Sequence, residues 1–285
     1  MRIANLLDRA VLIVDGDGTP ASPGRAVDVE RASDGRFGPS LESVFEDWRA
    51  FAAWAGEADL AGGETYDAAT LGPPVPRPRQ IFGIGLNYRD HAEEAGLDIP
   101  SELLVFTKFA SCLAGPVSEV SLPSDRVDWE VELVVVIGTG GLRIPQDQAW
   151  DHVAGLTIGQ DLSERRVQFA VKPPQFSLGK SYPGFGPTGP AIVTTDELGD
   201  RDALSIGCDL DGASVQNGTT SDFIFPVADV VSRLSQVVHL LPGDLIFTGT
   251  PAGVGSVRTP RRYLASGETL VSRIEGLGEL TTHLV

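Results

Sequence analysis

Asp128, Glu130 and Glu132 occupy alternate positions in the stretch DWEVELVVVIG, and their carboxylates are the first candidates for chemistry. The alternation of polar and apolar residues predicts a strand, in which every second side chain lies on the same face. Val134 and Val136 continue that face, and their apolar character predicts that it is buried. Neighbouring carboxylates beside an apolar wall repel one another, which raises their pKa values, and a divalent cation removes that penalty.

Glu130 and Glu132 are therefore candidate metal ligands. Residues two apart in a strand are ~7 Å apart at their Cα atoms, so both carboxylates can converge on one ion. Asp161, in GLTIGQDLSER, is the candidate third ligand, because it ends a strand-like apolar stretch and does not lie on a charged surface. Oxygen ligands favour Mg²⁺, with Mn²⁺ and Ca²⁺ as alternatives, over Zn²⁺. The alternative interpretation is an amphipathic strand with a solvated outer face.

A candidate general base is the pair His91 and Glu94 in RDHAEEAG. If this segment is helical, positions i and i+3 share a face. A carboxylate beside an imidazole holds its tautomer and raises its basicity. The alternative is an ordinary surface helix, because the segment is polar throughout.

The three lysines of the chain are a further signal, because arginine supplies the rest of its 22 basic residues. They are Lys108, Lys172 and Lys180. A compositional bias explains the preference for arginine, but it does not explain where the lysines lie.

The composition narrows the possible partners and the class of protein. A net charge of −17 argues against nucleic acid and anionic membranes as partners. Cys112 and Cys208 fit no zinc motif or disulfide framework, which favours a reducing cytosol. Asp8 and Arg9 interrupt the apolar core that a signal peptide needs, and no apolar run approaches the ~20 residues of a membrane helix. We expect a cytoplasmic protein.

The first 72 residues predict a small α+β domain. Its strand candidates are RIANL, AVLIV and RAVDVE, and SLESVFEDWRAFAAWAG predicts one amphipathic helix with Ser40 as N-cap and Gly56 as its end. Residues 73–80 predict a stiff linker because of their prolines.

Residues 81–285 predict a second, mostly β domain. Strand candidates are QIFGIGLNY, VELVVVIG, GLTIGQDLS, PAIVTT, LSIGCDLDG and GDLIFTGTP, and helix candidates are PVADVVSRLSQVVHLLPG and RIPQDQAWDHVAG. Because regular helices do not separate the strands, a doubly wound parallel sheet is disfavoured, and a mixed β-roll or barrel with peripheral helices fits better. Phosphate-binding, dinucleotide and serine-hydrolase motifs are each incomplete.

Five blocks in this order resemble the fumarylacetoacetate hydrolase family: GIGLNYRDHAEEAG, DWEVELVVVIG, GLTIGQDLSER, QFSLGKSYPGFGPTGP and LLPGDLIFTGTPAGVG. The resemblance covers roughly residues 78–285. It implies an α+β, mostly β fold, with a mixed β-roll or sandwich catalytic domain behind a small N-terminal domain. It also implies that Glu130, Glu132 and Asp161 bind Mg²⁺ or a similar ion.

The resemblance implies roles for further residues. His91 and Glu94 would activate water on a lid, and Lys180 would stabilise negative charge. The implied substrate-binding residues are Gln175, Thr250, Arg165 and Lys108. Arg166 beside Arg165 leaves the register open, and a surface position is an equal alternative for Lys108.

Two positions depart from the family pattern: Pro183 stands where many relatives have Asp, and Gln160 where many have Asn. The first bears on substrate identity more than on metal binding, and neither removes a proposed ligand.

The resemblance implies metal-dependent hydrolysis of a carbon–carbon bond in a 1,3-diketo acid, of the acylpyruvate or fumarylpyruvate type, in a homodimer. The same chemistry supports an oxaloacetate-type decarboxylase or a 2-hydroxyhepta-2,4-diene-1,7-dioate-type isomerase. An alternative of another class is a non-catalytic, metal-dependent binder of keto acids.

Overall fold

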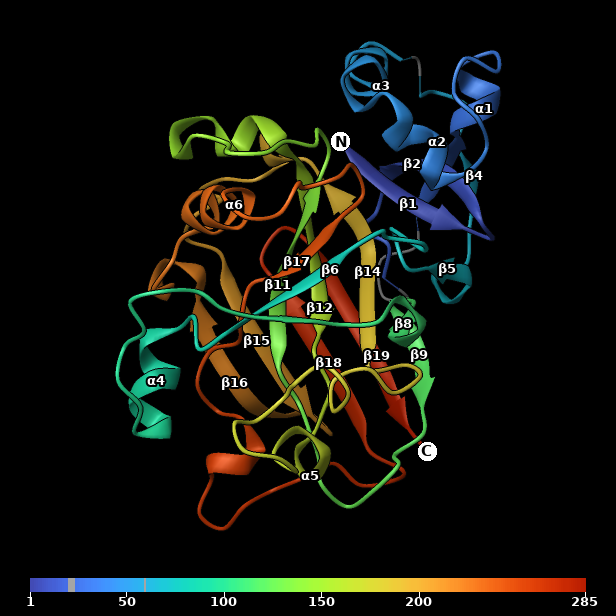
Figure 1. The fold of residues 1–285 in the computed structure, drawn as a ribbon. Helices are drawn as coiled ribbons and strands as arrows, with labels where there is room; N and C mark the ends of the chain where they lie inside the picture. The colour runs from blue at the N-terminus through green and yellow to red at the C-terminus, as the bar shows by residue number, and fades with distance from the viewer. Residues whose placement is uncertain (20–23, 59) are drawn as a thin grey trace.

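The computed structural model describes residues 1–19, 24–58 and 60–285, and a 12-stranded mixed sheet runs through it (Figure 1). The strands are β1 (Arg2–Leu6), β2 (Arg9–Asp15), β3 (Arg25–Asp28), β4 (Glu64–Thr65), β5 (Leu71–Gly72), β6 (Ile81–Gly85), β7 (Leu104–Thr107), β8 (Leu113–Ala114), β11 (Val131–Ile137), β12 (Val153–Gln160), β14 (Gly186–Val193) and β17 (Leu245–Phe247). Their order is β4-β3-β2-β1-β14-β12-β11-β17-β6-β7, with β5 beside β1 and β8 beside β14. Most neighbours are antiparallel, whereas β17 and β6, and β14 and β8, run parallel.

A five-stranded sheet packs against this one, in the order β16-β15-β18-β19-β9. Its strands are β9 (Val117–Val120), β15 (Ser205–Leu210), β16 (Ala213–Thr219), β18 (Thr269–Ile274) and β19 (Gly278–Leu284). A two-stranded ribbon joins β10 (Val127–Asp128) to β13 (Ser163–Glu164). The fold is mostly β with peripheral helices, and neither sheet closes into a barrel, which confirms the predicted fold class and its sandwich form.

Strand β11 is buried on both faces, because each face meets a different layer. Leu133 and Val135 belong to the core shared with the five-stranded sheet, whereas Val134 and Val136 belong to a core shared with the N-terminal helices. The apolar run in the sequence therefore reflects a central strand between two layers.

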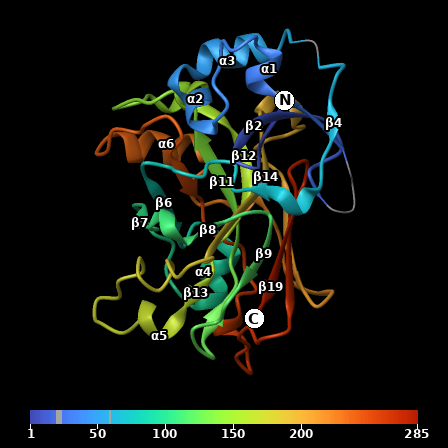
Figure 2. The same cartoon turned by 90° about the vertical axis from the view of Figure 1, so that its right-hand side faces the viewer.

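The N-terminal helices are α1 (Val29–Ala32), α2 (Leu41–Glu46) and α3 (Trp48–Ala55), grouped at one end of the molecule in Figures 1 and 2. The single helix predicted here is wrong, because the chain breaks at Asp47, which has φ −143° and ψ 77°. The Asp47 side chain accepts a hydrogen bond from the Ala50 N–H at 3.1 Å and so begins a new helix. Ser40 is the predicted N-cap, and α3 ends at Gly56 as expected.

The N-terminal strands continue the main sheet. Strand β1 pairs antiparallel with β14, with Arg2 opposite Val193. The amino terminus of Met1 also donates to the Thr194 hydroxyl at 2.6 Å. The main sheet thus contains strands from both proposed domains, residues 1–72 and 81–285, on either side of the linker at 73–80. These domain boundaries stay a prediction.

The remaining helices are α4 (Arg89–Ala95), α5 (Arg165–Gln168) and α6 (Val227–Ser235), with 3₁₀ turns at Ala68–Thr70, Ala110–Cys112, Gln146–His152, Thr195–Glu197, Thr220–Asp222 and Gly255–Val257. The helix expected to reach Leu241 ends at Ser235, because the next residues turn and the Leu240 N–H donates to Gly141. The helix expected in RIPQDQAWDHVAG is the 3₁₀ segment Gln146–His152. Within the described ranges, no helix combines the length and the apolar character that crossing a bilayer requires.

Candidate functional site

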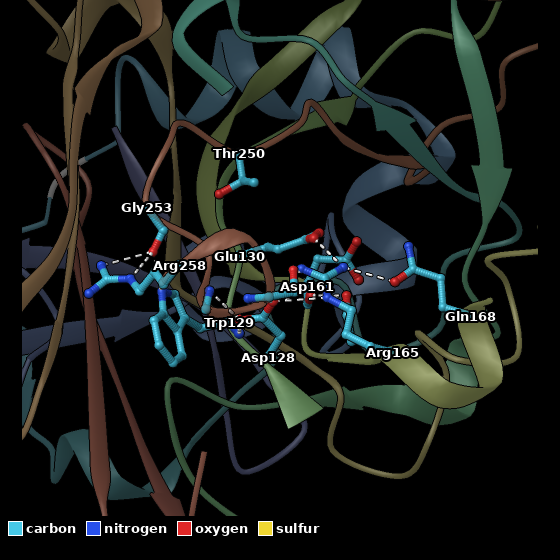
Figure 3. A network of polar contacts seen from close by, with 12 residues as sticks. Asp128, Trp129, Glu130, Asp161, Arg165, Gln168, Thr250, Gly253 and Arg258 are labelled. Atoms are coloured by element: carbon cyan, nitrogen blue, oxygen red, sulfur yellow. Dashed lines mark hydrogen bonds and ion pairs between the residues drawn. The ribbon is translucent and has the colours of Figure 1, made fainter. Parts of the chain in front are cut away.

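The three predicted metal ligands lie together. Glu130, Glu132 and Asp161 are buried, and one oxygen of each lies within 4.8 Å of the others. Antiparallel pairing of Val131 with Gln160 places the start of β11 beside the end of β12, which brings the carboxylates together. Figure 3 shows Glu130 and Asp161 within one network of polar contacts.

Two buried glutamines hold the backbone at the start of β11. The Gln160 Oε1 accepts from the Glu130 N–H at 2.5 Å, and the Gln216 Oε1 accepts from the Val131 N–H at 3.0 Å. The Gln160 amide also donates to the Ser272 hydroxyl at 2.9 Å. Gln160, which departs from the family pattern, therefore contacts the backbone and leaves the triad assembled.

Asp128 does not join the triad, although its spacing places it on the same predicted face. Strand β10 ends at Asp128 and β11 begins at Val131, so the alternation is broken between them. The Asp128 carboxylate accepts from Arg165 Nη2 at 2.7 Å and from the N–H groups of Gly255 and Ser256 at 2.7 and 2.9 Å. It fixes the loop beside the site.

Two lysine side chains contact carboxylates of the triad. Lys180 Nζ lies 2.5 Å from Glu130 Oε2, 2.6 Å from Asp161 Oδ2 and 2.8 Å from the Ser163 hydroxyl, which uses all three of its N–H groups. Lys108 Nζ lies 2.6 Å from Asp161 Oδ1. Lys108 is 3% exposed, which excludes the alternative of a surface lysine.

These cations stabilise the negative charges of the three carboxylates to different extents. Burial opposes ionisation of Glu130, but the charges of Lys180 and Arg165 outweigh it and lower its pKa to about 2. Burial also opposes the charge on Lys180, yet Asp161 and Glu130 raise its pKa. Both groups are therefore charged at neutral pH.

Glu132 is left without a cation. Burial, followed by the negative charges of Asp161 and Glu130, raises its pKa well above the usual value. Its Oε2 accepts from the Gly249 N–H at 2.8 Å, and no ion pair to Glu132 occurs within the described residues. A buried carboxylate beside two others and without a counter-charge fits a divalent cation.

The raised pKa predicts a pH dependence. A carboxylate whose folded pKa is raised stabilises the fold below its unfolded pKa and loses that contribution as pH rises through the folded pKa. The metal-free protein should therefore become less stable, through Glu132, as pH rises above the ordinary value of 4.5. Because Mn²⁺ must displace this proton, the stabilisation by Mn²⁺ should grow as pH rises above 4.5. Thermal unfolding with and without Mn²⁺ measures both trends, and a pH-independent Mn²⁺ effect would contradict them.

Arg165 faces the site, whereas Arg166 points outward. Arg165 Nη1 lies 2.8 Å from Glu130 Oε1 and donates to Gln168 Oε1 at 2.8 Å (Figure 3). Arg166 is 64% exposed and pairs with Asp125. Gln168 lines the cavity and was missed by the sequence analysis; its spacing of three from Arg165 on α5 is the signal that could have found it.

His91 and Glu94 lie on α4 as expected and share a face. His91 Nδ1 is 3.6 Å from Glu94 Oε2, which is an electrostatic contact longer than a hydrogen bond. The Gly253 N–H donates to Glu94 Oε2 at 2.9 Å, and His91 and this bond lower the pKa of Glu94. His91 Nδ1 is buried and has no hydrogen-bond partner within the described chain.

The predicted substrate-binding residues are placed differently from one another. Thr250 lines the cavity, but its hydroxyl donates to the Val131 carbonyl at 2.8 Å and accepts from Gln216 at 2.7 Å. Gln175 is exposed, and its amide donates to Ser177 at 3.1 Å, away from the cavity lining. Arg165 lines the cavity, whereas Lys108 lies behind it.

Several of these groups line one cavity of about 210 Å³. Its polar floor carries Glu130, Glu132, Arg165 and Lys180, and His91 stands at its side. The arrangement can hold a cation with a small anionic ligand next to a titratable imidazole.

Comparisons with known proteins identify relatives of this chain. Residues 80–285 match the family described as fumarylacetoacetate (FAA) hydrolase, C-terminal. The human mitochondrial oxaloacetate tautomerase FAHD2A is 44% identical over 214 residues, covering 74% of this chain and 68% of the human protein. A Mycobacterium smegmatis protein with the provisional name HpcE is 50% identical, with a TM-score of 0.93 over 100% of this chain and 99% of that chain. Fumarylpyruvate hydrolase from Pseudomonas aeruginosa, solved with Mn²⁺ and pyruvate, is 32% identical, with a TM-score of 0.66 over 79% of this chain and 93% of that chain.

Proposed function

The chain belongs to the fumarylacetoacetate hydrolase family of enzymes, and from this premise we propose that it hydrolyses a carbon–carbon bond in a 1,3-diketo acid. The substrate would be of the acylpyruvate or fumarylpyruvate type. The observation that carries the proposal is a buried acidic triad, two of whose carboxylates, Glu130 and Glu132, line one cavity together with an ammonium group and a separate imidazole. The alternative of a non-catalytic binder loses its support, because the family consists of enzymes.

Glu130, Glu132 and Asp161 would hold the divalent cation, for which we propose Mg²⁺, with Mn²⁺ or Ca²⁺ as alternatives. The cation, when bound, supplies Lewis-acid polarisation of the oxygens at the 2-oxo acid end of the substrate. Support for a divalent ion comes from the uncompensated Glu132 and from the Mn²⁺ in the Pseudomonas relative.

The His91–Glu94 pair would act as the base. Because Nδ1 faces Glu94, the Nε2 atom of His91 is the one available to take a proton from water. The resulting hydroxide adds to the distal carbonyl carbon, and the bond from that carbon to the methylene breaks. The electron pair passes to a pyruvate enolate, which is protonated at carbon to give pyruvate and a carboxylic acid.

Lys180 would stabilise the negative charge of the enolate by its position. Its ammonium group lines the cavity, and its pKa is raised, so it carries a full charge. The same group holds Glu130 and Asp161 in place, which joins the ligand set to the site of charge development.

A second candidate is tautomerisation of oxaloacetate, the reaction in the name of the human relative, or decarboxylation of the same acid. An isomerase acting on an unsaturated dioic acid would use the same enolate chemistry. These reactions need no attack by water at a distal carbonyl, so substitution of His91 distinguishes them from hydrolysis.

We also propose a homodimer in the cytoplasm. The family resemblance supports the homodimer, and the free cysteines support the cytoplasm.

His91→Asn is expected to lower hydrolysis of acetylpyruvate by about 10²- to 10⁴-fold, because it removes the base. Turnover of oxaloacetate should fall much less. Both reactions are measured with Mn²⁺, and His283→Asn, at an exposed position, is the matched control. Equal losses in the two reactions would count against a base at His91, and wild-type turnover of oxaloacetate alone would remove the hydrolase assignment.

A further inference from the structure

The outer part of the cavity differs in chemistry from its floor. We propose that the substrate carries an uncharged, apolar acyl group, so that the enzyme prefers alkyl- or aryl-acylpyruvates to acylpyruvates that carry a second carboxylate, such as fumarylpyruvate. This inference rests on the proposed hydrolysis and adds the chemical class of the group that is cleaved off.

The cavity is bounded by an apolar wall, formed by Leu97, Leu104, Phe106, Phe169 and Phe176. These side chains come from three separate segments: the turn after α4, strand β7, and the chain after α5. Their convergence on one cavity therefore depends on the tertiary fold. The wall is continuous with the floor, because Phe106 lies under Lys180 Nζ, 4.9 Å from its ring centroid.

Aromatic rings link the segments of the wall. Phe106 and Phe176 have centroids 5.7 Å apart, and Phe169 and Phe176 are 6.1 Å apart, both edge to face. Such pairs favour a fixed arrangement over independent surface side chains.

Two glycines of β6 make room for this wall. A Cβ atom at Gly83 would lie 2.2 Å from the Phe106 ring, and one at Gly85 would lie 2.7 Å from Leu104. The glycines of the stretch GIG thus allow β7 side chains to lie flat over β6. Their function is steric.

The wall leaves apolar surface uncovered at the site. Leu97 is 56% exposed, Leu104 is 48% exposed and Phe169 is 55% exposed. Apolar surface gathered at a ligand cavity is typical of a binding surface, whereas single exposed apolar residues are common. An acyl chain extending from a keto acid on the floor would cover it.

Among the described residues that line the cavity, no free cation is available for a second carboxylate. Of the described basic residues that line the cavity, Arg165 binds Asp128 and Glu130, and Lys180 binds Glu130 and Asp161. His91 Nδ1 faces Glu94. The residues outside the described ranges, 20–23 and 59, include no basic side chain. The distal carboxylate of a diacid would therefore lie unpaired against the apolar wall, which is unfavourable.

The test compares kcat/KM for acetylpyruvate, hexanoylpyruvate and fumarylpyruvate, using the full chain with Mn²⁺. Each methylene buried against the wall should raise kcat/KM by about four-fold, so hexanoylpyruvate should exceed acetylpyruvate by at least about ten-fold. Fumarylpyruvate should fall below hexanoylpyruvate. Phe169→Arg should lower the hexanoyl-to-fumaryl ratio by at least about ten-fold, because it removes apolar surface and adds a cation.

Leu142→Arg is the matched control, since Leu142 is 51% exposed and does not line the cavity. A wild-type preference for fumarylpyruvate would overturn the inference and leave the hydrolase proposal intact, as would an equal change of the ratio in both variants. If no acylpyruvate is cleaved, the hydrolase proposal fails, and calorimetric Kd values for the same acids decide the acyl preference. Tighter binding of hexanoylpyruvate then supports the apolar site, and tighter binding of fumarylpyruvate overturns it.

Discussion

Glu132→Gln is expected to abolish metal-dependent turnover while leaving the metal-free protein at least as stable as the wild type. The glutamine keeps the size of the side chain and an oxygen for the Gly249 N–H. It removes the one carboxylate of the triad that lacks a counter-charge and whose pKa is raised by burial and by Asp161 and Glu130. Neutralising it relieves repulsion in the metal-free state but removes a ligand charge from the cation site.

The affinity for Mn²⁺ should fall by at least about 100-fold in Glu132→Gln, because changes to groups that only orient a ligand already cost 10- to 100-fold. Calorimetry measures the Kd, and thermal unfolding in chelator measures the stability. Glu119→Gln, at an exposed position on β9, should change neither quantity. A variant that binds Mn²⁺ as tightly as the wild type would refute the assignment of Glu132 as a ligand.

Lys180→Met should lower both stability and turnover. The ammonium group is buried and paired with Glu130 and Asp161, so its loss leaves two buried carboxylates with one cation fewer. Breaking a buried pair from one side costs about 3–5 kcal/mol of unfolding free energy. Turnover should fall by about 10²- to 10³-fold, because the proposed stabilisation of the enolate is lost as well.

Two further variants separate these effects. Arg166→Met breaks a surface pair with Asp125 and should cost less than about 1 kcal/mol. Lys180→Arg keeps the charge and should recover part of the unfolding free energy, which allows turnover to be measured in a folded protein. Full activity in Lys180→Met would show that Lys180 has no part in catalysis.

Short sequence patterns correctly placed several strands and one helix N-cap. The strands β6, β11, β12, β14, β15 and β17 lie where alternation or apolar runs indicated them, and Ser40 begins α2 through its side chain. The apolar spacing continues through Asp47 and so predicts one helix. In the structure, the Asp47 side chain caps a second helix. The helix after Pro226 is shorter than predicted, because the Leu240 backbone pairs with the backbone of Gly141. Gly141 lies about one hundred residues earlier in the chain, so the local pattern does not contain this contact.

The sequence by itself determined which residue types meet at the centre: paired glutamates on a strand, an aspartate at the end of another, and rare lysines. Only the tertiary structure decided how the charges are shared, because pairing of β11 with β12 and the approach of the Lys180 loop are long-range contacts. It gave Glu130 and Asp161 ammonium partners, turned Asp128 toward Arg165 and left Glu132 alone. Likewise, the apolar wall is scattered over three segments and becomes one surface only when they pack together. Spacing along a strand fixes which side chains share a face, but partners and burial depend on segments that the local pattern does not contain.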